Sequence, residues 1–553
     1  MSTHHQLSEA IERVINDARK AGALIADAPE SVPLERPKNR EHGDYATSIA
    51  LALAKSAGKP PREIAELIAT GLRSLEIIDR VDIAGPGFIN ITLAKATQGA
   101  IVINILENNV KFGIGNELAG VKVNLEFISA NPTGPLHLGH TRWAAVGDAL
   151  ARVLSAAGAE VSREFYINDR GVQMDLFGES LRASALGIAK PEAGYQGGYI
   201  DDLAKKIVLA EPDLLKLSEP ESLVAFREAG YKLQLQEQKD VLAKFGTNFQ
   251  VWFSERSLHA GDGLTKAMAR LKEQGHIFDD EGATWLRTTD FGDDKDRVLR
   301  KSDGELTYFA SDTAYYIDKR NRGFDICIYM LGADHHGYVG RLKATSACAG
   351  DNPEYNIEIL IGQLVKIIEG GAEVKLSKRA GTIITLEELV EKVGVDAARY
   401  TLIRYPVETP MVLDVDLLKK RTNENPVFYV QYAHARIVAV LRNATDLGVK
   451  YGLEFYKPEL LEHERERELL GGLAEFPRIV AGAAQLREPH RIARYLEDLA
   501  GMYHGFYTDC RVLPMGDEKP SELHSARATL SAATMQVFFN GLQLLGVSAP
   551  DRM

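Results

Sequence analysis

Two histidines stand close together in the stretch SANPTGPLHLGHTRW, which runs from Ser129 to Trp143. His137 and His140 are separated by a leucine and Gly139. The β-rich run VKVNLEFIS precedes them and a helical pattern follows, so a strand passes through a Gly/Pro loop into a helix. The first N–H groups of a helix lack intrahelical partners, and imidazole N–H groups can donate to phosphate oxygens without a metal. The stretch indicates a phosphate site, although a capped helix with two surface histidines would contain the same residues.

A basic segment, KLSKRAGT, occupies residues 375–382. Lys375, Lys378 and Arg379 surround Ser377, and glycines stand on both sides of the segment. A loop of this kind can close over a triphosphate and neutralise charge on a leaving pyrophosphate. A basic loop alone is more often solvated surface, so this interpretation depends on its pairing with the two histidines upstream.

The patterns around these motifs divide the chain into three parts. Two helical runs and a strand pair around a Gly-Pro-Gly turn predict an N-terminal α+β domain over residues 1–115. Strand, helix and strand patterns around the histidines predict a βαβ unit, with a second half of the sheet near 297–370. We therefore expect an α/β, Rossmann-type parallel-sheet catalytic domain over 116–385, with a charged helical insertion at about 176–290. The remaining pattern is almost wholly helical and predicts an all-α C-terminal domain over 386–553.

Composition argues against several classes of protein. The chain has 553 residues, 45% hydrophobic and 26% charged, with no apolar run near the roughly 18 residues of a membrane span. The start of the sequence lacks the apolar core of a signal peptide, so we expect a cytoplasmic protein with no membrane partner. Cys327, Cys348 and Cys510 form no C-x-x-C pair, which argues against structural zinc and disulfides. The net charge of −12 argues against a general nucleic-acid coat but leaves room for a local basic groove.

The two motifs together resemble the signature motifs of the class I aminoacyl-tRNA synthetases, usually written HIGH and KMSKS. The second motif departs from that pattern, with Leu376 in place of methionine and Arg379 in place of serine, while Lys375 is kept. Further segments resemble the bacterial type of arginyl-tRNA synthetase: FISANPTGPLHLGHTR, YINDRGVQM, YFASDTAYY, GADHHGY, NPVFYVQYAHARI, FYTDCRVL and GVSAPDRM. The segment RPKNREHGDYAT resembles the extra N-terminal domain of that family, so the resemblance covers nearly the whole chain.

This resemblance implies an arginine–tRNA ligase of protein synthesis. Such an enzyme activates L-arginine with ATP, accompanied by Mg²⁺, to arginyl-adenylate and transfers the arginyl group to the 3′ end of tRNA(Arg). The arginine carboxylate is the nucleophile, so catalysis is positional and electrostatic. The resemblance also implies a cytoplasmic monomer, an anticodon-binding helical C-terminal domain and an N-terminal domain that contacts the tRNA elbow.

The resemblance assigns roles to individual residues of this sequence, and it assigns no protein metal site. The catalytic set is His137, His140, Lys375 and Lys378; the ATP-binding set is Thr133, Gly139, Ser377 and Asp334; the arginine-binding set is Glu126, Ser129, Asn131, Tyr308, Asp312 and His335; and the tRNA-binding set is Tyr429, Tyr432 and Arg436.

Recognition of an arginine side chain has its own chemistry, because a guanidinium prefers carboxylates in a planar fork. Tyr308 and Asp312 are four apart, so a helix would place both on one face, and Glu126 ends the strand before the histidine loop. Asp334 and His335 follow a buried strand, at the end where parallel sheets hold ligands. A second histidine follows, but successive side chains on a strand alternate in direction, which argues against a metal site. Solvated carboxylates and an ordinary helix face are the alternatives for these positions.

Aromatic residues recur at helical spacing in NPVFYVQYAHARI, which contains Tyr429, Tyr432 and Arg436. Exposed aromatic and arginine side chains can read unpaired anticodon bases by stacking and edge hydrogen bonds. The same stripe is also typical of a helix that packs into a core.

Other interpretations stay open at this point. A cysteinyl enzyme would need zinc-binding thiolates, and a glutamyl enzyme would need a basic pocket. A small-molecule nucleotidyltransferase shares the His-x-Gly-His pattern but needs neither a helical C-terminal domain nor a distant basic loop. An inactive tRNA-binding or regulatory paralogue would be expected to have lost His137, His140 or Lys378, and all three are present.

Overall fold

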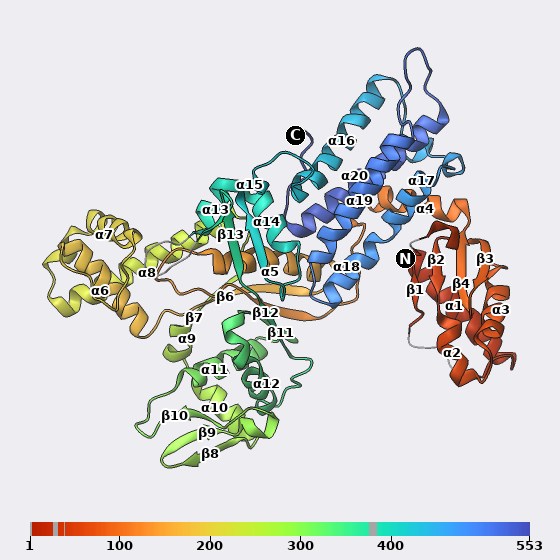
Figure 1. Ribbon diagram of the computed structural model, residues 1–553. Helices are drawn as coiled ribbons and strands as arrows, with labels where there is room; N and C mark the ends of the chain where they lie inside the picture. Colours follow the sequence, from red (N-terminus) through yellow and green to blue (C-terminus); the bar gives the residue numbers. More distant parts are fainter. Residues whose placement is uncertain (1–2, 26–30, 38, 375–383) are drawn as a thin grey trace.

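The computed structural model describes residues 3–25, 31–37, 39–374 and 384–553. Figure 1 shows four lobes around a central sheet: the N-terminal lobe in red, a helical lobe in yellow, a mixed lobe in green and a helical bundle in blue. The basic segment with Lys375, Ser377 and Lys378 lies outside the described residues, so the roles of these three residues stay predictions.

The N-terminal lobe is an antiparallel sheet, in the order β1-β2-β4-β3, packed with helices. Its buried apolar residues, from Leu7 to Leu93, form a hydrophobic core of their own. A separate core is what an independent folding unit needs. The elements are α1 (Thr3–Lys20), β1 (Leu34–Glu35), β2 (Tyr45–Thr47), α2 (Ile49–Ala57), α3 (Pro61–Leu72), β3 (Ile78–Ala84) and β4 (Phe88–Leu93).

The central sheet has five parallel strands in the order β12-β11-β5-β6-β7. From β5 the chain moves outward through β6 to β7, then returns to the other side of β5 for β11 and β12. This reversal creates a switch point between the carboxyl ends of β5 and β11, where open α/β sheets bind ligands. The strands are β5 (Lys122–Glu126), β6 (Glu160–Ile167), β7 (Val251–Ser254), β11 (Ile326–Gly332) and β12 (Ile357–Gly362); the connecting helices include α5 (Leu138–Ala156), α11 (Tyr308–Asn321) and α12 (Val339–Cys348). The expected Rossmann-type parallel sheet is confirmed.

Two excursions leave this sheet, one before β7 and one after it. The first is the helical lobe of α6 (Val172–Leu186), α7 (Gly198–Ala210) and α8 (Glu219–Lys244), which has its own small core. The second comprises α9 (Glu255–Ala260), α10 (Gly263–Glu273) and an antiparallel sheet of β8 (Ile277–Asp280), β9 (Ala283–Leu286) and β10 (Arg297–Arg300). The range expected as one insertion, about 176–290, therefore contains a strand of the central sheet.

The helical C-terminal part is joined to the sheet by one continuous core, whose buried residues run from Ile101 to Val547. A small sheet lies at the junction: β13 (Val365–Glu369), β14 (Ala372–Glu373) and β15 (Met411–Asp414), with β13 parallel to β15. The helices are α13 (Leu386–Val393), α14 (Val395–Ile403), α15 (Val415–Leu418), α16 (Pro426–Asp446), α17 (Glu464–Ala474), α18 (Phe476–Gln485), α19 (His490–Asp509) and α20 (Glu522–Leu545); α4 (Lys95–Asn108) packs against α17 and α20.

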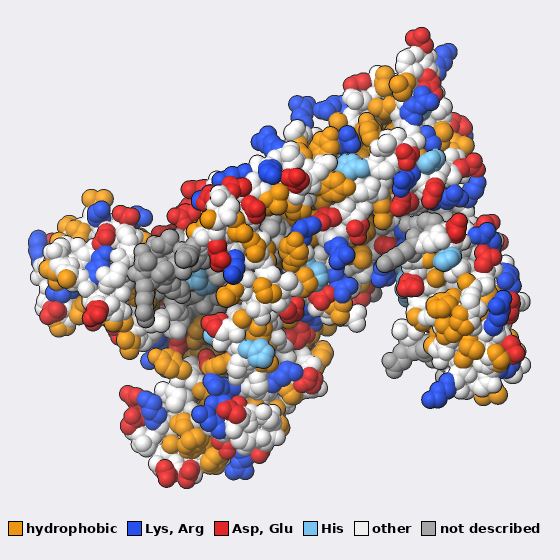
Figure 2. Space-filling view, in the orientation of Figure 1, with side chains coloured by type: hydrophobic (Ala, Val, Ile, Leu, Met, Phe, Trp, Pro, Cys, Tyr) orange, Lys and Arg blue, Asp and Glu red, His pale blue; other side chains and the backbone are white. Residues whose placement is uncertain are grey.

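Lys and Arg side chains alternate with Asp and Glu over the face that Figure 2 shows. This mixture agrees with the acidic net charge and with the absence of a general basic coat on that face. In the described part of the chain, no helix combines the length and the apolar character needed to cross a bilayer.

Candidate active site

The loop after β5 begins with a strained backbone. Ile128 and Ser129 both have positive φ, 72° and 45°. A β-branched residue rarely adopts this conformation, so the surrounding contacts must hold it in place. Ile128 is buried, and the Ser129 hydroxyl donates to Glu126 Oε1 at 2.9 Å while it accepts the backbone N–H of Tyr166 at 3.2 Å. The strained turn directs the chain across the switch point of the sheet.

His137 caps the N-terminus of α5, and His140 lies one turn further on. His137 Nδ1 accepts the N–H of Gly139 at 3.2 Å, and the His137 N–H donates to His140 Nδ1 at 3.4 Å. The two rings stack with centroids 3.9 Å apart. Because each Nδ1 accepts a hydrogen bond, each neutral imidazole carries its proton on Nε2. Two Nε2–H donors beside a helix N-terminus form an arrangement suited to phosphate oxygens.

Gly139 is required by this arrangement. A Cβ atom at this position would lie 3.0 Å from Cε1 and 3.1 Å from Nδ1 of His137. Such contacts are tighter than ordinary van der Waals contacts, so the capping imidazole would have to shift by a few tenths of an ångström to admit a Cβ atom here. The glycine between the histidines therefore allows the first ring to fold over the helix end.

The first motif is tied by backbone bonds to the chain that follows the second. The Leu138 N–H donates to the Ile384 carbonyl at 3.1 Å, and the Leu386 N–H donates to the Leu136 carbonyl at 2.9 Å. Ile384 is the first described residue after the basic segment. These bonds hold Ile384 and Leu386 beside the start of α5.

Glu126 is buried at the end of β5, and its carboxylate already has two partners. Lys319 Nζ donates to Oε2 at 2.6 Å, and Ser129 holds the other oxygen. Lys319 is fully buried and lies over the rings of Tyr315 and Tyr329, at 4.3 and 3.7 Å from their centroids. Sequence reasoning found Glu126 but missed this internal lysine, which offsets much of its charge.

Two further carboxylates face the same region, and one of them was missed. Burial, helped by the charge of Glu126, raises the pKa of Asp312, which accepts a hydrogen bond from the Tyr338 hydroxyl. Burial, helped by the charge of Asp312, also raises the pKa of Glu255. Glu255 is the first residue of α9, directly after β7, so it lies at the carboxyl end of a parallel strand like Glu126. Within the described ranges, Asp312 forms no ion pair with a lysine or an arginine.

A buried carboxylate with a raised pKa is stabilised when a cation binds beside it. The signal for Glu255 was present in the run VWFSE, an apolar strand that ends in an acid. It was missed because this run lies inside the range interpreted as a helical insertion.

The other predicted residues for arginine and ATP lie around this centre. Tyr308 begins α11 and is 70% exposed, with its hydroxyl directed at Gly171. Asp334 and His335 are exposed on a short 3-10 turn, Ala333–Tyr338, after β11, with Nε2 of the histidine 3.6 Å from Oδ2 of the aspartate. The His335 charge also counters the pKa shift of Asp312. These side chains form a rim at the switch point rather than its floor.

Asn131 and Thr133 belong to the loop itself. The Asn131 amide donates to Gln173 of α6, and the Thr133 carbonyl accepts the Tyr199 hydroxyl of α7 at 2.9 Å. Gln238 of α8 donates to the Asn131 carbonyl at 3.1 Å. The helical lobe therefore holds the loop through three separate helices.

Tyr429, Tyr432 and Arg436 share one half-exposed face of α16. The Arg436 guanidinium lies over the Tyr432 ring at 5.0 Å and over the Tyr507 ring at 4.9 Å, and it contacts His504 Nδ1 at 3.4 Å. The three predicted residues are thus brought together, and two residues of α19 complete the cluster. Tyr507 and His504 were missed because nothing in the sequence pairs these helices.

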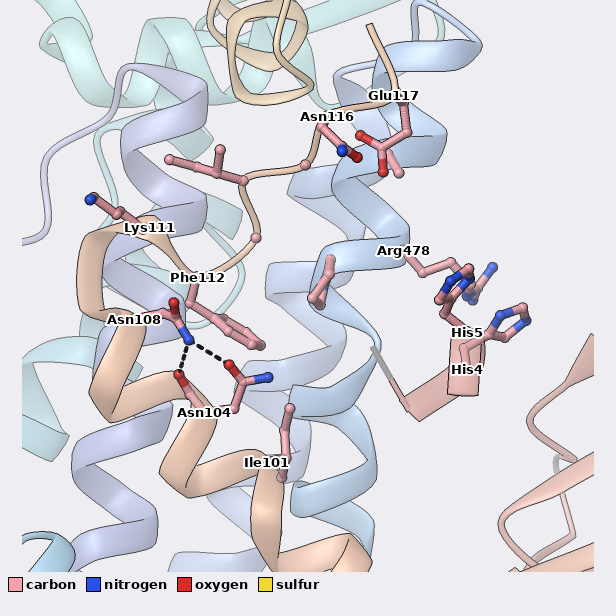
Figure 3. A pocket seen from close by; sticks show the side chains of 15 residues that line it. His4, His5, Ile101, Asn104, Asn108, Lys111, Phe112, Asn116, Glu117 and Arg478 are labelled. Carbon is pink, nitrogen blue, oxygen red and sulfur yellow. Dashed lines mark hydrogen bonds between the residues drawn. The ribbon is translucent and has the colours of Figure 1, made fainter. Parts of the chain in front are cut away.

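A cavity of about 520 Å³ lies away from all these residues, between α1, α4 and α18. Figure 3 shows its lining, with His4, His5 and Arg478 on one side and Asn104, Asn108, Lys111 and Phe112 on the other. None of the predicted site residues lines it. No cluster of His, Cys, Asp and Glu in the described ranges has the geometry of a metal site.

Comparison with known proteins identifies three domains in order along the chain. The arginyl tRNA synthetase N terminal domain matches residues 5–93, and the DALR anticodon binding domain matches residues 430–553. The catalytic domain of the class I (R) tRNA synthetases matches residues 101–205 and 217–434. With the parallel sheet and its switch point, this match defines a class I aminoacyl-tRNA synthetase.

Full-length relatives narrow the class further. The arginine–tRNA ligases of Pseudarthrobacter chlorophenolicus and Frankia alni are each 54% identical, over all of this chain and all of theirs. The arginyl-tRNA synthetase of Thermus thermophilus has the same fold, with a TM-score of 0.77 at 22% identity over all of both chains. This chain belongs to the arginyl-tRNA synthetase family.

Proposed function

We propose that this chain is an arginine–tRNA ligase, which activates L-arginine with ATP and transfers the arginyl group to the 3′ end of tRNA(Arg). The observation that carries the substrate assignment is the group of carboxylates along the carboxyl edge of the sheet, Glu126, Asp312 and Glu255. Two of them have raised pKa values, which a cationic guanidinium would relieve. A pocket for a neutral or acidic amino acid would not concentrate negative charge in this way.

The arginine pocket adjoins a phosphate site, and this neighbourhood suits adenylate formation. The arginine carboxylate attacks the α-phosphorus of ATP, the bond to the bridging oxygen of the β-phosphate breaks, and pyrophosphate leaves. His137 and His140 donate to phosphate oxygens, while Lys375 and Lys378 neutralise charge on the transition state and the leaving group. No protein nucleophile takes part.

The remaining predicted residues have supporting roles in this proposal. Ser129, Asn131 and Tyr308 complete the arginine site, with His335 at its rim. Thr133, Gly139, Ser377 and Asp334 belong to the ATP site. Mg²⁺ enters with ATP as part of the nucleotide substrate. We add Glu255 to the arginine-binding set, because it ends a neighbouring parallel strand and its pKa is raised by burial.

The cluster of α16 and α19 is proposed to bind unpaired anticodon bases of tRNA. Tyr429, Tyr432 and Arg436 are half-exposed and adjacent, and stacking of bases on such groups is tolerant of sequence. We place the domain boundaries at 1–115, 116–385 and 386–553. The protein acts as a monomer in the cytoplasm, where its tRNA is charged for translation.

Exchange of labelled pyrophosphate into ATP tests the substrate assignment. Each amino acid is supplied alone, with and without tRNA(Arg). The proposal is supported if arginine is the only amino acid that gives exchange. Comparison of the exchange rates with and without tRNA(Arg) shows whether the active site is preformed. Exchange with a different amino acid, or with none under either condition, would rule the proposal out.

A further inference from the structure

Arg142 is a buried cation on α5, two residues after His140, and it is 3% exposed. Its Nη1 donates to the carbonyls of Gln363 at 3.2 Å and Thr409 at 2.9 Å. Its Nη2 donates to the carbonyls of Pro406 at 2.7 Å and Tyr405 at 3.5 Å. Burial lowers its pKa to about 10, the nearby charge of Glu408 opposes this shift, and no carboxylate among the described residues forms an ion pair with the guanidinium. Burying a charge in this way is costly, and the four carbonyls offset that cost.

The positions of these carbonyls in the chain show which parts of the fold the contact joins. Gln363 lies between β12 and β13, and the chain continues from β13 through β14 directly to the basic segment. Residues 405–409 lead into β15, the parallel neighbour of β13. One guanidinium therefore joins the helix of the first motif to the segments that lead into β13 and β15.

Neighbouring contacts strengthen this joint. A side chain on Gly362 would run into the indole of Trp143, so α5 and the end of β12 are in close contact. On the far side of the basic segment, the backbone bonds of Leu138 to Ile384 and of Leu386 to Leu136 tie the chain to the same helix end. The N-terminal part of α5 is thus held from two directions, by the backbone of Ile384 and Leu386 and by the carbonyls that Arg142 contacts.

We propose that Arg142 is a positioning residue that fixes the place of the histidines of the first motif relative to the link between β12 and β13 and to the segment that leads into β15. It touches no substrate, and its effect is transmitted through the carbonyls of Gln363 and residues 405–409. The inference rests on the proposed roles of His137 and His140. Lysine keeps the charge but carries its donors on one nitrogen, so it cannot span these carbonyls as the forked guanidinium does.

Arg142→Lys is therefore expected to lower kcat for arginine-dependent pyrophosphate exchange by about 10- to 100-fold, because displacement of catalytic groups by about 1 Å has an effect of that size. The KM for ATP is expected to rise, since the phosphates contact both motifs. The KM for arginine is expected to stay within about twofold, because the arginine pocket lies on other elements. Assays are run well below the melting temperature of each variant, with the folded fraction measured by circular dichroism.

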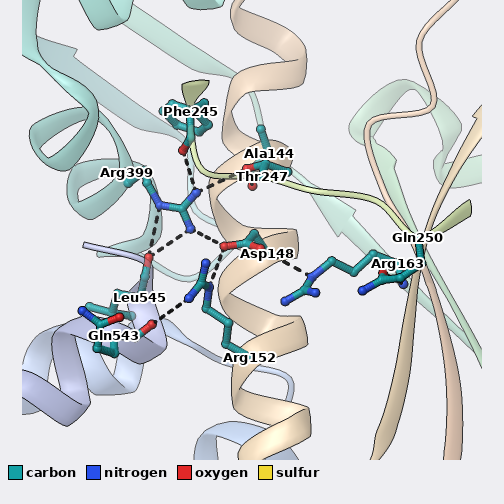
Figure 4. Close-up of polar contacts among 10 residues, drawn as sticks. All are labelled: Ala144, Asp148, Arg152, Arg163, Phe245, Thr247, Gln250, Arg399, Gln543 and Leu545. Carbon is teal, nitrogen blue, oxygen red and sulfur yellow. Dashed lines mark hydrogen bonds and ion pairs between the residues drawn. The ribbon is translucent and has the colours of Figure 1, made fainter. Parts of the chain in front are cut away.

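The matched control is Arg399→Lys. Arg399 is also fully buried and donates to the carbonyls of Phe245 at 3.0 Å and Leu545 at 3.1 Å. Figure 4 shows that it contacts α5 through Asp148, which lies eight residues after His140 in the sequence. This variant is expected to lose a similar amount of thermal stability while its kcat and its KM for ATP per folded molecule stay near those of the parent.

Two outcomes would overturn the inference. One is a parent-like kcat for folded Arg142→Lys; the other is an equal loss of kcat in Arg399→Lys, which would indicate loosened packing of α5. Arg142→Gln replaces Arg142→Lys if the latter does not fold. His140→Ala serves as a separate check: parent-like activity in that variant would overturn the proposed catalytic roles themselves, whatever Arg142 does.

Discussion

Asp312 carries the sharpest prediction about a single residue. Asp312→Asn keeps the shape of the side chain and an acceptor for the Tyr338 hydroxyl but removes the charge that a guanidinium needs. The KM for arginine is expected to rise by about 30-fold, which corresponds to about 2 kcal/mol for a charge-assisted pair. Steady-state exchange kinetics measure this change. Asp318→Asn, on the same helix and paired with Arg322, is the control, and a similar KM effect in the control would remove Asp312 from the pocket.

The same carboxylates predict a dependence of arginine binding on pH. The pKa values of Asp312 and Glu255 are raised, mainly by burial, so both groups take up protons at a higher pH than ordinary carboxyl groups. The folded-state pKa of each group lies above its unfolded value. The free folded protein therefore gains stability from these groups as the pH falls through the folded-state pKa. Arginine binding needs the charged forms and is lost over the same interval. The KM for arginine should therefore rise as the pH falls, starting at a higher pH than ordinary carboxyl groups would give, and the rise should be smaller in Asp312→Asn.

A flat pH profile in the parent would contradict the assignment of these carboxylates to the arginine pocket. The profile of Asp312→Asn over the same pH range is the reference, because this variant lacks one of the two titrating groups.

For single residues of the site, the sequence predicts the residue types well and their interaction partners poorly. The spacing of Tyr308 and Asp312 and the strand-end position of Glu126 follow from local patterns. The pairing of Glu126 with Lys319 joins β5 to the end of α11 across the fold, so no local pattern reveals it. The roles of Lys375, Ser377 and Lys378 still stand as predictions.

At the scale of single elements, helix propensity and the geometry of the site make different demands on Gly139 at the start of α5. Replacement of Gly139 by alanine in a helix would normally stabilise it by about 1 kcal/mol. The added Cβ would, however, displace the His137 cap, and loss of a cap costs about 1 kcal/mol. These effects nearly cancel, so Gly139→Ala should leave the melting temperature almost unchanged while kcat for exchange falls.

The control for this substitution is Gly482→Ala in α18, where a Cβ atom would meet no atom within 4 Å. It should raise the melting temperature and leave exchange unaffected. A parent-like kcat in Gly139→Ala would show that the position of the His137 ring does not matter for catalysis.

The sequence patterns missed several short strands, among them β2, β8, β9 and β15, and the one of most consequence for the central sheet is β7. It is four residues long, has half-buried side chains and lies between two charged helical segments, so neither its length nor its composition sets it apart. The long amphipathic and apolar segments were recognisable because their periodicity extends over many residues. Pairing with β6 makes Val251–Ser254 a strand, and that pairing is a property of the assembled sheet.

On the scale of the whole molecule, the tRNA-binding cluster and the arginine pocket lie on different parts of one body. Figure 1 shows α16 and α19 in the bundle above the central sheet, and a continuous core joins the bundle to that sheet. Sequence reasoning could identify the helical part but not its shared core, because buried residues of α14, α16 and α20 become neighbours only on folding. A common core predicts that substitutions on the exposed face of the bundle alter tRNA binding without altering the arginine pocket.

Arg436→Ala tests this separation. Arg436 lies over two tyrosine rings and contacts His504, so its loss removes both a cation and the packing that orients the aromatic face. The KM for tRNA in aminoacylation should rise by about 10-fold or more, in line with about 1–3 kcal/mol for a stacked base. The KM for arginine should not change.

Arg442→Ala removes the same charge from an exposed position of the same helix, so it shares the general electrostatic loss but not the stacking loss. Because only the Arg436 variant perturbs the aromatic face, the KM for tRNA should differ between the two variants at high salt, where general phosphate contacts are screened. Equal KM values at high salt would mean that the cluster contributes charge alone and reads no base.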